Sequence, residues 1–279
     1  MFTTLITPKD LARHLDDPDW VIFDCRFTLT ELEAGRRAYE REHIPGARYA
    51  HLEEDLSSPV TQQTGRHPLP DPGELAEKLG RWGVGPDSQV AAYDDTFGAI
   101  ASRMWWLLRW LGHDAVAVLD GGLPRWRREG RPLTDELPAP RPRRFEPRRR
   151  DDMWVGTSRV GALAREGVLI DARAEERFLG DVEPLDKVAG HVPGAVNIPY
   201  EDNLDVDGSF LPPDDLRALY GDLCAGRPPE GVAHMCGSGV TACHNILAME
   251  AAGLNGSVLY PGSWSEWILD PGRPAATGP

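Results

Sequence analysis

The chain has 279 residues and a formal net charge of −14 at pH 7. This length suits about two domains of roughly 150 residues each, and the acidic balance argues against nucleic acid and anionic membranes as general partners. The N-terminus lacks a signal-peptide pattern, and no segment approaches ~18 consecutive apolar residues, so we expect no membrane span and a cytoplasmic location. The few cysteines lack the spacing of zinc sites, which indicates free thiols, and we expect neither a metal nor an organic cofactor.

The first half alternates short apolar runs with helical patterns. In chain order it predicts a strand at 21–24, a helix at 73–82, a strand at 90–94, a helix at 99–111 and a strand at 115–119. Such an order is typical of an α/β domain whose mostly parallel sheet is flanked by helices on both faces. Ligands of these domains bind beyond the carboxyl ends of the strands, and Asp94 lies at such an end.

A segment rich in proline and arginine separates the two halves. Residues 138–150 hold too many prolines for a helix or strand, so they predict an extended linker. The run has no interleaved aromatic platform for bases, and we expect a solvated tether on an acidic surface. We therefore set the first domain at residues 1–135, the linker at 136–156 and the second domain at 157–279.

The second half repeats the pattern of the first. Residues 21–26 correspond to 169–173, and residues 43–47 correspond to 191–195. A period of this length indicates duplication of a whole domain rather than a solenoid. Residues that recur in both halves, among them Asp24, Asp171, His43 and His191, are expected to be structural.

Cys236 is the residue at which the halves differ most. It follows the apolar run 231–235 and precedes a small-residue loop that leads into the helical pattern 245–249, whereas Asp94 holds its place in the first half. Backbone N–H groups of such a loop can surround a sulfur atom at a helix N-terminus. Because thiols in that setting ionise readily, we expect Cys236 to be nucleophilic at neutral pH. Cys243 is expected on the following helix as a small buried residue.

From about Thr7 to Trp267, the duplicated pattern with a cysteine loop only in its second half resembles the tandem-domain rhodanese-type sulfurtransferases. Within that family the loop is similar to the 3-mercaptopyruvate sulfurtransferase form, since thiosulfate enzymes typically carry Arg and Lys after the cysteine. The resemblance implies two tandem rhodanese-like domains, the first without chemistry because a carboxylate cannot carry a persulfide.

The implied reaction moves a sulfane sulfur from 3-mercaptopyruvate, through a persulfide on Cys236, to a thiol such as thioredoxin or glutathione, or to cyanide, with release of pyruvate. The resemblance also implies the groups that surround the persulfide. The loop residues expected to hold substrate are Gly237, Gly239, Val240 and Thr241. Their backbone N–H groups would stabilise the outer sulfur, and the hydroxyl of Ser238 adds a further donor.

Two further sets of residues are carried over from the family. Arg177 matches the arginine that binds the substrate carboxylate, but the place of the second family arginine falls at Asp186, where the adjacent Lys187 offers a point charge. This departure keeps thiosulfate as an alternative donor. Asp55, His67 and Ser238 resemble a proton relay.

A reactive cysteine loop also occurs in two other classes of protein. A cysteine phosphatase needs an arginine that closes the loop around phosphate, and the sequence has none from Cys236 to Gly262. A carrier or sensor, in which Cys236 is only a modifiable thiol, stays open as an alternative.

Overall fold

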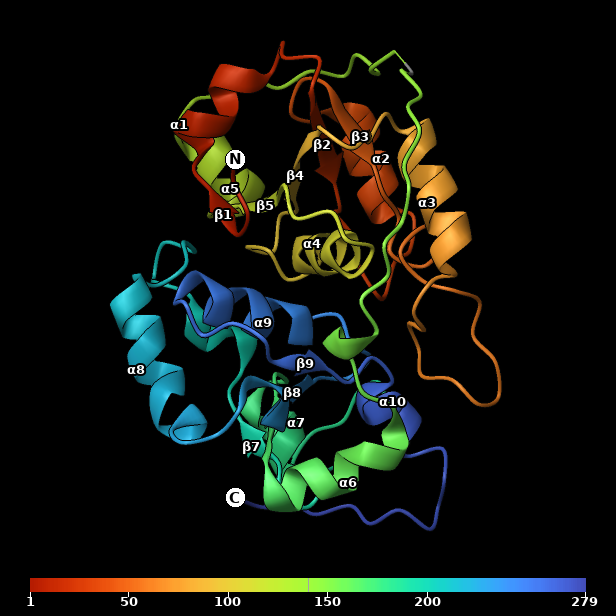
Figure 1. Cartoon of the computed structure of the whole chain (residues 1–279), viewed down its shortest axis with the longest axis vertical. Coiled ribbons are helices and arrows are strands. Elements are labelled where there is room, and N and C mark those ends of the chain that lie inside the picture. The colour runs from red at the N-terminus through yellow and green to blue at the C-terminus, as the bar shows by residue number, and fades with distance from the viewer. Residues whose placement is uncertain (140) are drawn as a thin grey trace. The chain divides into compact units, whose positions relative to one another are not determined.

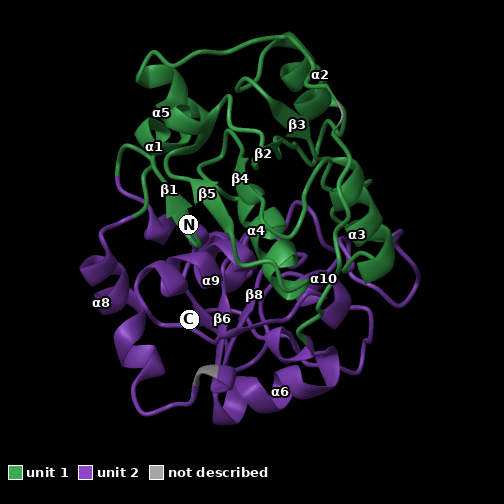
Figure 2. Ribbon diagram, turned by 45° about the horizontal axis from the view of Figure 1, so that its top comes forward, with its two compact units in different colours: residues 1–58, 69–150, 206–210 green, residues 59–68, 151–205, 211–279 purple. Residues whose placement is uncertain are grey.

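The computed structural model describes residues 1–139 and 141–279, which form two compact units (Figure 1). Unit 1 comprises residues 1–58, 69–150 and 206–210, and unit 2 comprises residues 59–68, 151–205 and 211–279 (Figure 2). The predicted domain limits stay predictions; the units depart from them because 59–68 group with unit 2 and 206–210 with unit 1. Pro140 of the predicted linker lies outside the described residues.

Unit 1 is built on a parallel sheet of five strands in the order β1-β5-β4-β2-β3. The strands are β1 (Leu5–Ile6), β2 (Trp20–Asp24), β3 (Ala47–Tyr49), β4 (Gln89–Tyr93) and β5 (Val116–Leu119). The helices are α1 (Pro8–Leu11), α2 (Ala34–Arg41), α3 (Pro72–Arg81), α4 (Ala101–Trp110) and α5 (Gly122–Arg128), with a 3-10 turn η1 at Ala12–His14.

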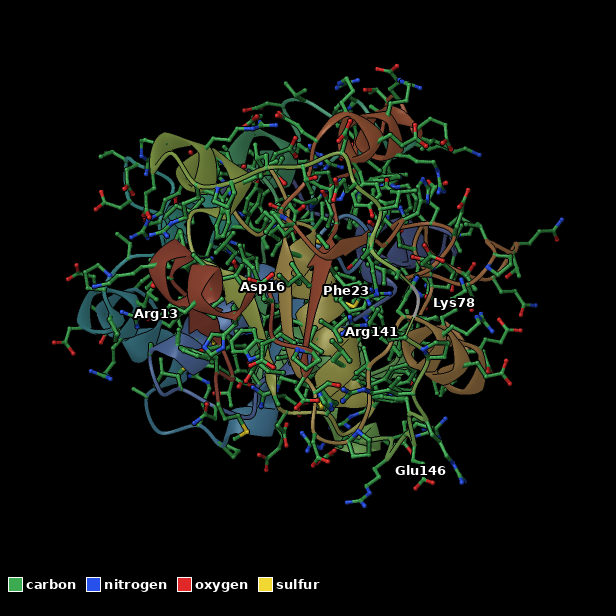
Figure 3. All side chains as sticks on the ribbon, turned by 90° about the horizontal axis from the view of Figure 1, so that it is seen from above. Arg13, Asp16, Phe23, Lys78, Arg141 and Glu146 are labelled. Carbon is green, nitrogen blue, oxygen red and sulfur yellow. The ribbon has the colours of Figure 1, made fainter. Side chains whose placement is uncertain are left out.

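Burial explains why these segments form a parallel sheet. Every residue of β4 and β5 is buried, which requires cover on both faces. Phe23 on β2 is fully buried and lies among the other side chains in Figure 3, whereas Arg13 and Glu146 are exposed. Helix α3 begins where Asp71 caps it, since the carboxylate accepts the backbone N–H groups of residues 73 and 74, and Pro72 occupies the first helical position.

Unit 2 is built on a parallel sheet in the order β7-β6-β8-β9. The strands are β6 (Val168–Asp171), β7 (Val196–Asn197), β8 (Val232–Met235) and β9 (Val258–Leu259). The helices are α6 (Thr157–Glu166), α7 (Glu175–Leu179), α8 (Pro213–Cys224), α9 (Ala242–Ala251) and α10 (Ser263–Trp267), with 3-10 turns η2 (Asp151–Met153), η3 (Tyr200–Asn203) and η4 (Pro229–Gly231). None of the helices described in either unit is long and apolar enough to cross a lipid bilayer.

Buried arginine–aspartate pairs recur in both units. The Arg26 guanidinium bonds the Asp24 carboxylate with contacts of 2.6–3.0 Å, and Arg173 bonds Asp171 over the same range. Each arginine also donates to a backbone oxygen, that of Glu42 or that of Gly190. Pairs of this kind fix the chain after β2 and β6, which agrees with the structural role expected for the two aspartates.

The recurring histidines also bond the backbone. The Nδ1 atom of His43 lies 2.8 Å from the carbonyl oxygen of Tyr39, and that of His191 lies 2.8 Å from the carbonyl oxygen of Phe178. Both histidine residues also form an isolated antiparallel bridge, with residues 134 and 276 respectively. The two histidines therefore perform the same structural task in each copy.

The arginine-rich segment lies along unit 1 in extended form. Arg143 donates to Asp19 at 2.7 Å, and Arg150 forms two bonds of 2.7 Å to the Asp114 carboxylate. Its described residues up to 150 form no helix or long strand. Exposed pairs like these add about 0–1 kcal/mol each. These bonds hold the segment against acidic side chains of unit 1, and its role as a linker stays a prediction.

Candidate active site

Cys236 lies where β8 ends and is only 2% exposed. Its Sγ atom accepts a hydrogen bond from the backbone N–H of Gly239 at 3.2 Å. Its own N–H donates to the Oγ atom of Ser263 at 3.0 Å. The loop then enters α9, a ten-residue helix with no charged side chain in its first turn. The sulfur therefore lies against a backbone donor near a helix N-terminus, a setting that stabilises negative charge.

Gly239 is the loop position that only glycine can occupy. Its φ angle is +76°, a backbone conformation that residues other than glycine rarely adopt. A methyl group on its Cα atom would lie 2.4 Å from the carbonyl oxygen of Pro261. The glycine therefore allows the turn that presents its N–H to the sulfur.

Helix α10 fixes the other side of the loop. The N–H of Trp264 donates to the Cys236 carbonyl at 3.0 Å, and the N–H of Ser265 donates to the Gly237 carbonyl at 2.9 Å. Ser263 adopts a positive φ of 53°, and its hydroxyl also donates to the Tyr260 carbonyl at 2.9 Å. The strained backbone at Ser263 places its hydroxyl where it bonds both the N–H of Cys236 and the carbonyl of Tyr260.

The equivalent loop of unit 1 shows what this backbone geometry binds. After β4, the buried Asp94 carboxylate accepts four backbone N–H groups at 2.8–2.9 Å, from Thr96, Gly98, Ile100 and Ala101. Burial raises the pKa of Asp94, and the four hydrogen bonds oppose that rise. The duplicated loop is thus an anion cradle, and in unit 1 a side chain of the protein fills it.

The structure brings His67 and Ser238 together within unit 2. The Nδ1 atom of His67 lies 2.7 Å from the Oγ atom of Ser238, and both side chains are buried. Asp55 lies in unit 1, where its carboxylate accepts from the ammonium group of Lys78 at 3.0 Å and from the backbone N–H of His51 at 2.8 Å. Its part in a relay stays a prediction.

Arg177 is held by two acidic side chains. Its Nε and Nη2 atoms donate to the Glu183 carboxylate at 2.8–3.2 Å, and Nη2 also lies 3.2 Å from Asp186. Burial raises the pKa of Glu183, but the bonds from Arg177 and from the N–H groups of residues 185 and 186 outweigh it and lower the pKa. Glu183 is therefore a fixed anion that orients the arginine.

Arg66 is a residue of the site that the sequence analysis missed. Its Nη1 and Nη2 atoms bond the Asp186 carboxylate at 3.0 and 3.3 Å. A methyl group at Gly237 would lie 3.3 Å from Nη2 of Arg66 and 3.6 Å from Nη1 of Arg177. Two guanidinium groups therefore lie beside the residue that follows the cysteine. The adjacent His67 was the only sequence signal, because Asp186 is 120 positions away.

Four other residues that the sequence analysis singled out lie as follows. Val240 and Thr241 accept N–H groups of the first turn of α9 through their carbonyls, both at 3.0 Å. Lys187 is exposed and forms no hydrogen bond or ion pair with any residue that the structure describes. Cys243 is buried on α9, as predicted, with its Sγ atom 3.5 Å from the Gly239 carbonyl.

Comparison with known proteins first identifies the family to which the chain belongs. The Rhodanese-like domain family matches residues 7–129 and 159–270, so the chain belongs to the rhodanese family and carries two copies of its domain. The chain is 51% identical over 278 residues to a protein of Pseudomonas aeruginosa named probable 3-mercaptopyruvate sulfurtransferase, with 98% of each chain covered.

Further relatives carry the names of both donors that the sequence analysis considers. The human 3-mercaptopyruvate sulfurtransferase is 37% identical, with 89% of this chain and 84% of its own length covered. The rat thiosulfate sulfurtransferase is 32% identical, with 96% and 93% covered. Among solved structures, the 3-mercaptopyruvate sulfurtransferase of Leishmania major matches with a TM-score of 0.82 at 31% identity, covering 95% of this chain and 74% of that one. These matches confirm the predicted fold.

Proposed function

We propose that the protein is a sulfurtransferase that takes a sulfane sulfur from 3-mercaptopyruvate onto Cys236 and passes it to a thiol or to cyanide. One observation carries the proposal: the Cys236 sulfur accepts the N–H of Gly239 in a small-residue loop that enters α9. The names of the relatives at 51% and 37% identity support the choice of donor.

In the first step the Cys236 thiolate attacks the sulfur of the donor. A sulfur–sulfur bond forms, the carbon–sulfur bond breaks, and its electron pair stays on the donor carbon as the enolate of pyruvate. The proton of the donor thiol ends on that carbon, so the products are the persulfide anion and pyruvate. The N–H groups of the loop stabilise the anion, as the equivalent groups stabilise the Asp94 carboxylate in unit 1.

The hydrogen bond between His67 and Ser238 supports a role for this pair in moving the proton. The hydroxyl belongs to the loop itself, two residues after Cys236, and the imidazole orients it at 2.7 Å. General acid–base help of this kind contributes about 10²–10⁴-fold to rate. Asp55 is the proposed third member.

In the second step an acceptor thiol, such as that of thioredoxin or glutathione, attacks the outer sulfur and leaves with it, which restores the Cys236 thiolate. Cyanide takes the same sulfur as thiocyanate. No organic cofactor or metal takes part in this scheme. No disulfide joins any two of the four cysteines in the structure, which supports a cytoplasmic setting.

Thiosulfate is the second candidate donor. The relatives named thiosulfate sulfurtransferase support it, and the loop argues against it, since Gly237 and Ser238 bring no charge to the rim.

The experiment that tests the proposal compares kcat/KM for 3-mercaptopyruvate, measured by pyruvate release, with kcat/KM for thiosulfate, measured by sulfite release, on one preparation. We expect the mercapto acid to be favoured. Cys236→Ser should abolish both activities, and Cys243→Ser is the matched control because that thiol is seven residues away on α9. Turnover by Cys236→Ser, or an equal loss of activity in Cys243→Ser, would reject Cys236 as the nucleophile.

A further inference from the structure

We propose that a cavity in unit 1 binds a small organic oxyanion, a carboxylate or a phosphate ester, and that Arg48 and Arg141 hold its charged group. The cavity lies at the amino ends of β2 and β3, whereas the Asp94 loop follows the carboxyl end of β4. The proposal makes no use of Cys236 and goes beyond the function proposed above.

The cavity has the size of a small-molecule site. Its volume is about 460 Å³, and such sites occupy roughly 300–1,000 Å³. Apolar groups line it from three places, namely Leu15 before β2, Trp20 at the start of β2 and Pro45 before β3. Asp16 and Arg141, which are labelled in Figure 3, also line it. A ligand here would therefore meet apolar surface as well as charge.

Arg48 is a cation without a carboxylate partner. Its side chain is partly buried, and its only bond to a described residue runs from Nη1 to the Gly46 carbonyl at 3.2 Å. Other partly buried arginines of unit 1 bond carboxylates, as Arg125, Arg143 and Arg150 do at 2.5–2.7 Å. Burying a charge without such a partner costs free energy. The Nε and Nη2 atoms of Arg48 are therefore available for an anion.

Arg141 adds a second positive charge beside the first. A methyl group placed on Gly83 would lie 2.9 Å from the Arg141 carbonyl oxygen and 3.8 Å from Nη2 of Arg48, so this glycine lets the two residues approach. Burial lowers the pKa of Arg48, Tyr39 opposes this fall, and the charge of Arg141 adds to it. Neither arginine forms an ion pair within the part of the chain that the structure describes. An anion between two like charges removes their repulsion.

The segment that carries Arg141 is held in place on both sides of the cavity. Before Arg141, the Nε2 atom of His43 lies 3.1 Å from the Glu136 carbonyl oxygen. After it, the N–H of Arg143 donates to the Gly80 carbonyl at 2.8 Å, and its guanidinium forms the ion pair described above. Because the protein itself holds this wall, ordering it adds little to the entropic cost of binding.

The other charges of the cavity select an anion of low charge. Asp16, Asp17 and Glu136 line the same cavity as the two arginines. They weaken the attraction for a polyanion, whereas the planar forks of the arginines still form directional bonds to one carboxylate or phosphate group. The apolar lining then contacts the organic body of the ligand.

The test is isothermal titration calorimetry of the full chain with benzoate, phenyl phosphate and inorganic phosphate. We expect one saturable site per chain for at least one organic probe, and weaker binding of inorganic phosphate because it lacks the organic body. The tighter organic probe assigns the site to carboxylates or to phosphate esters. Saturable binding of neither organic probe would overturn the proposal, and equally tight inorganic phosphate would overturn the part given to the apolar lining.

Arg48→Gln should lower the affinity for the tighter probe by about 10- to 100-fold, since bonds to charged groups are worth roughly 1.5–3 kcal/mol. Arg48→Lys keeps the charge but loses the fork, so its affinity should lie between the two. The matched control is Arg41→Gln, which removes the same charge from the exposed end of α2 in the same unit. An equal fall in Arg41→Gln would overturn the site.

Thermal unfolding separates a binding role from a structural one. Because Arg48 is a partly buried cation beside another, Arg48→Gln should leave the Tm of the free protein unchanged or raise it. The tighter probe should raise the Tm of the wild type by mass action and that of Arg48→Gln by less. Arg141→Gln changes an exposed side chain, so it tests the same site without risk to folding, and its affinity should fall as well. Wild-type affinity in both variants would overturn the proposal.

Discussion

Replacing Gly239 by alanine tests the cradle at its tightest point. The new methyl group would lie 2.4 Å from the carbonyl oxygen of Pro261 and 2.8 Å from its Cα atom, and φ is +76°. The left-handed conformation alone costs about 1–2 kcal/mol for a residue with a Cβ atom. No rotamer relieves a contact with backbone, so the loop must move, and the N–H of residue 239 then leaves the Cys236 sulfur.

Loss of one preorganised donor to a developing anion lowers rates by about 10²–10³-fold. We therefore expect persulfide formation in Gly239→Ala to slow by at least about 100-fold in a single-turnover experiment, with a lowered Tm. Gly237→Ala is the control, because the three atoms nearest to its methyl group would be side-chain nitrogens and not backbone: Nη2 of Arg66 at 3.3 Å, and Nη1 and Nη2 of Arg177 at 3.6 and 3.7 Å. Its effect should fall on KM. A folded Gly239→Ala protein that forms persulfide at the wild-type rate would refute the cradle.

Three further predictions concern buried polar groups. Burial lowers the pKa of His234 to about 3, below the 6.5 of a free imidazole, so only the unfolded chain binds this proton between those values. The free energy of unfolding, measured with urea, should fall by about 1.4 kcal/mol per pH unit as the pH drops through that range. In His234→Leu the dependence of this free energy on pH should correspond to one proton fewer taken up on unfolding. Asp94→Ala leaves four backbone N–H groups without their acceptor, two of them buried and two partly buried, and should lower the free energy of unfolding by at least about 3 kcal/mol; a loss under about 1 kcal/mol would contradict the bonds described. Ser238→Ala should lower kcat for 3-mercaptopyruvate by about 10²-fold, and a change confined to KM would remove the serine from proton transfer.

Local patterns were enough to predict much of the fold. Strands β2, β4 and β8 are runs of mostly buried residues, and the segments that follow β4 and β8 have helical spacing, so these elements were visible within a short window. Helix α2, which follows β2, was not predicted, because only two of its residues, Gly35 and Tyr39, are buried. The cysteine loop was predictable for the same reason, since β8, the loop and α9 are contiguous. The short strands β3 and β7, of three and two residues, carry no pattern of their own.

Long-range contacts account for what the sequence did not predict. The bond between the N–H of Arg66 and Ser265 joins residues 199 positions apart, and it ties the segment 59–68 to unit 2. Counting along the chain from Arg177 leads to Asp186 and Lys187, and it cannot show that a cation from another segment faces Asp186. The four N–H bonds of Asp94 were also unforeseen, although the loop type was predicted from the repeat.

The most direct measurement of the central claim is the mass of the protein after incubation with 3-mercaptopyruvate. Digestion without reductant and fragmentation should place one added sulfur atom on Cys236 and none on Cys243, and cyanide should remove it as thiocyanate. Pyruvate release with an unmodified Cys236, or sulfur found on Cys243 instead, would contradict the persulfide mechanism.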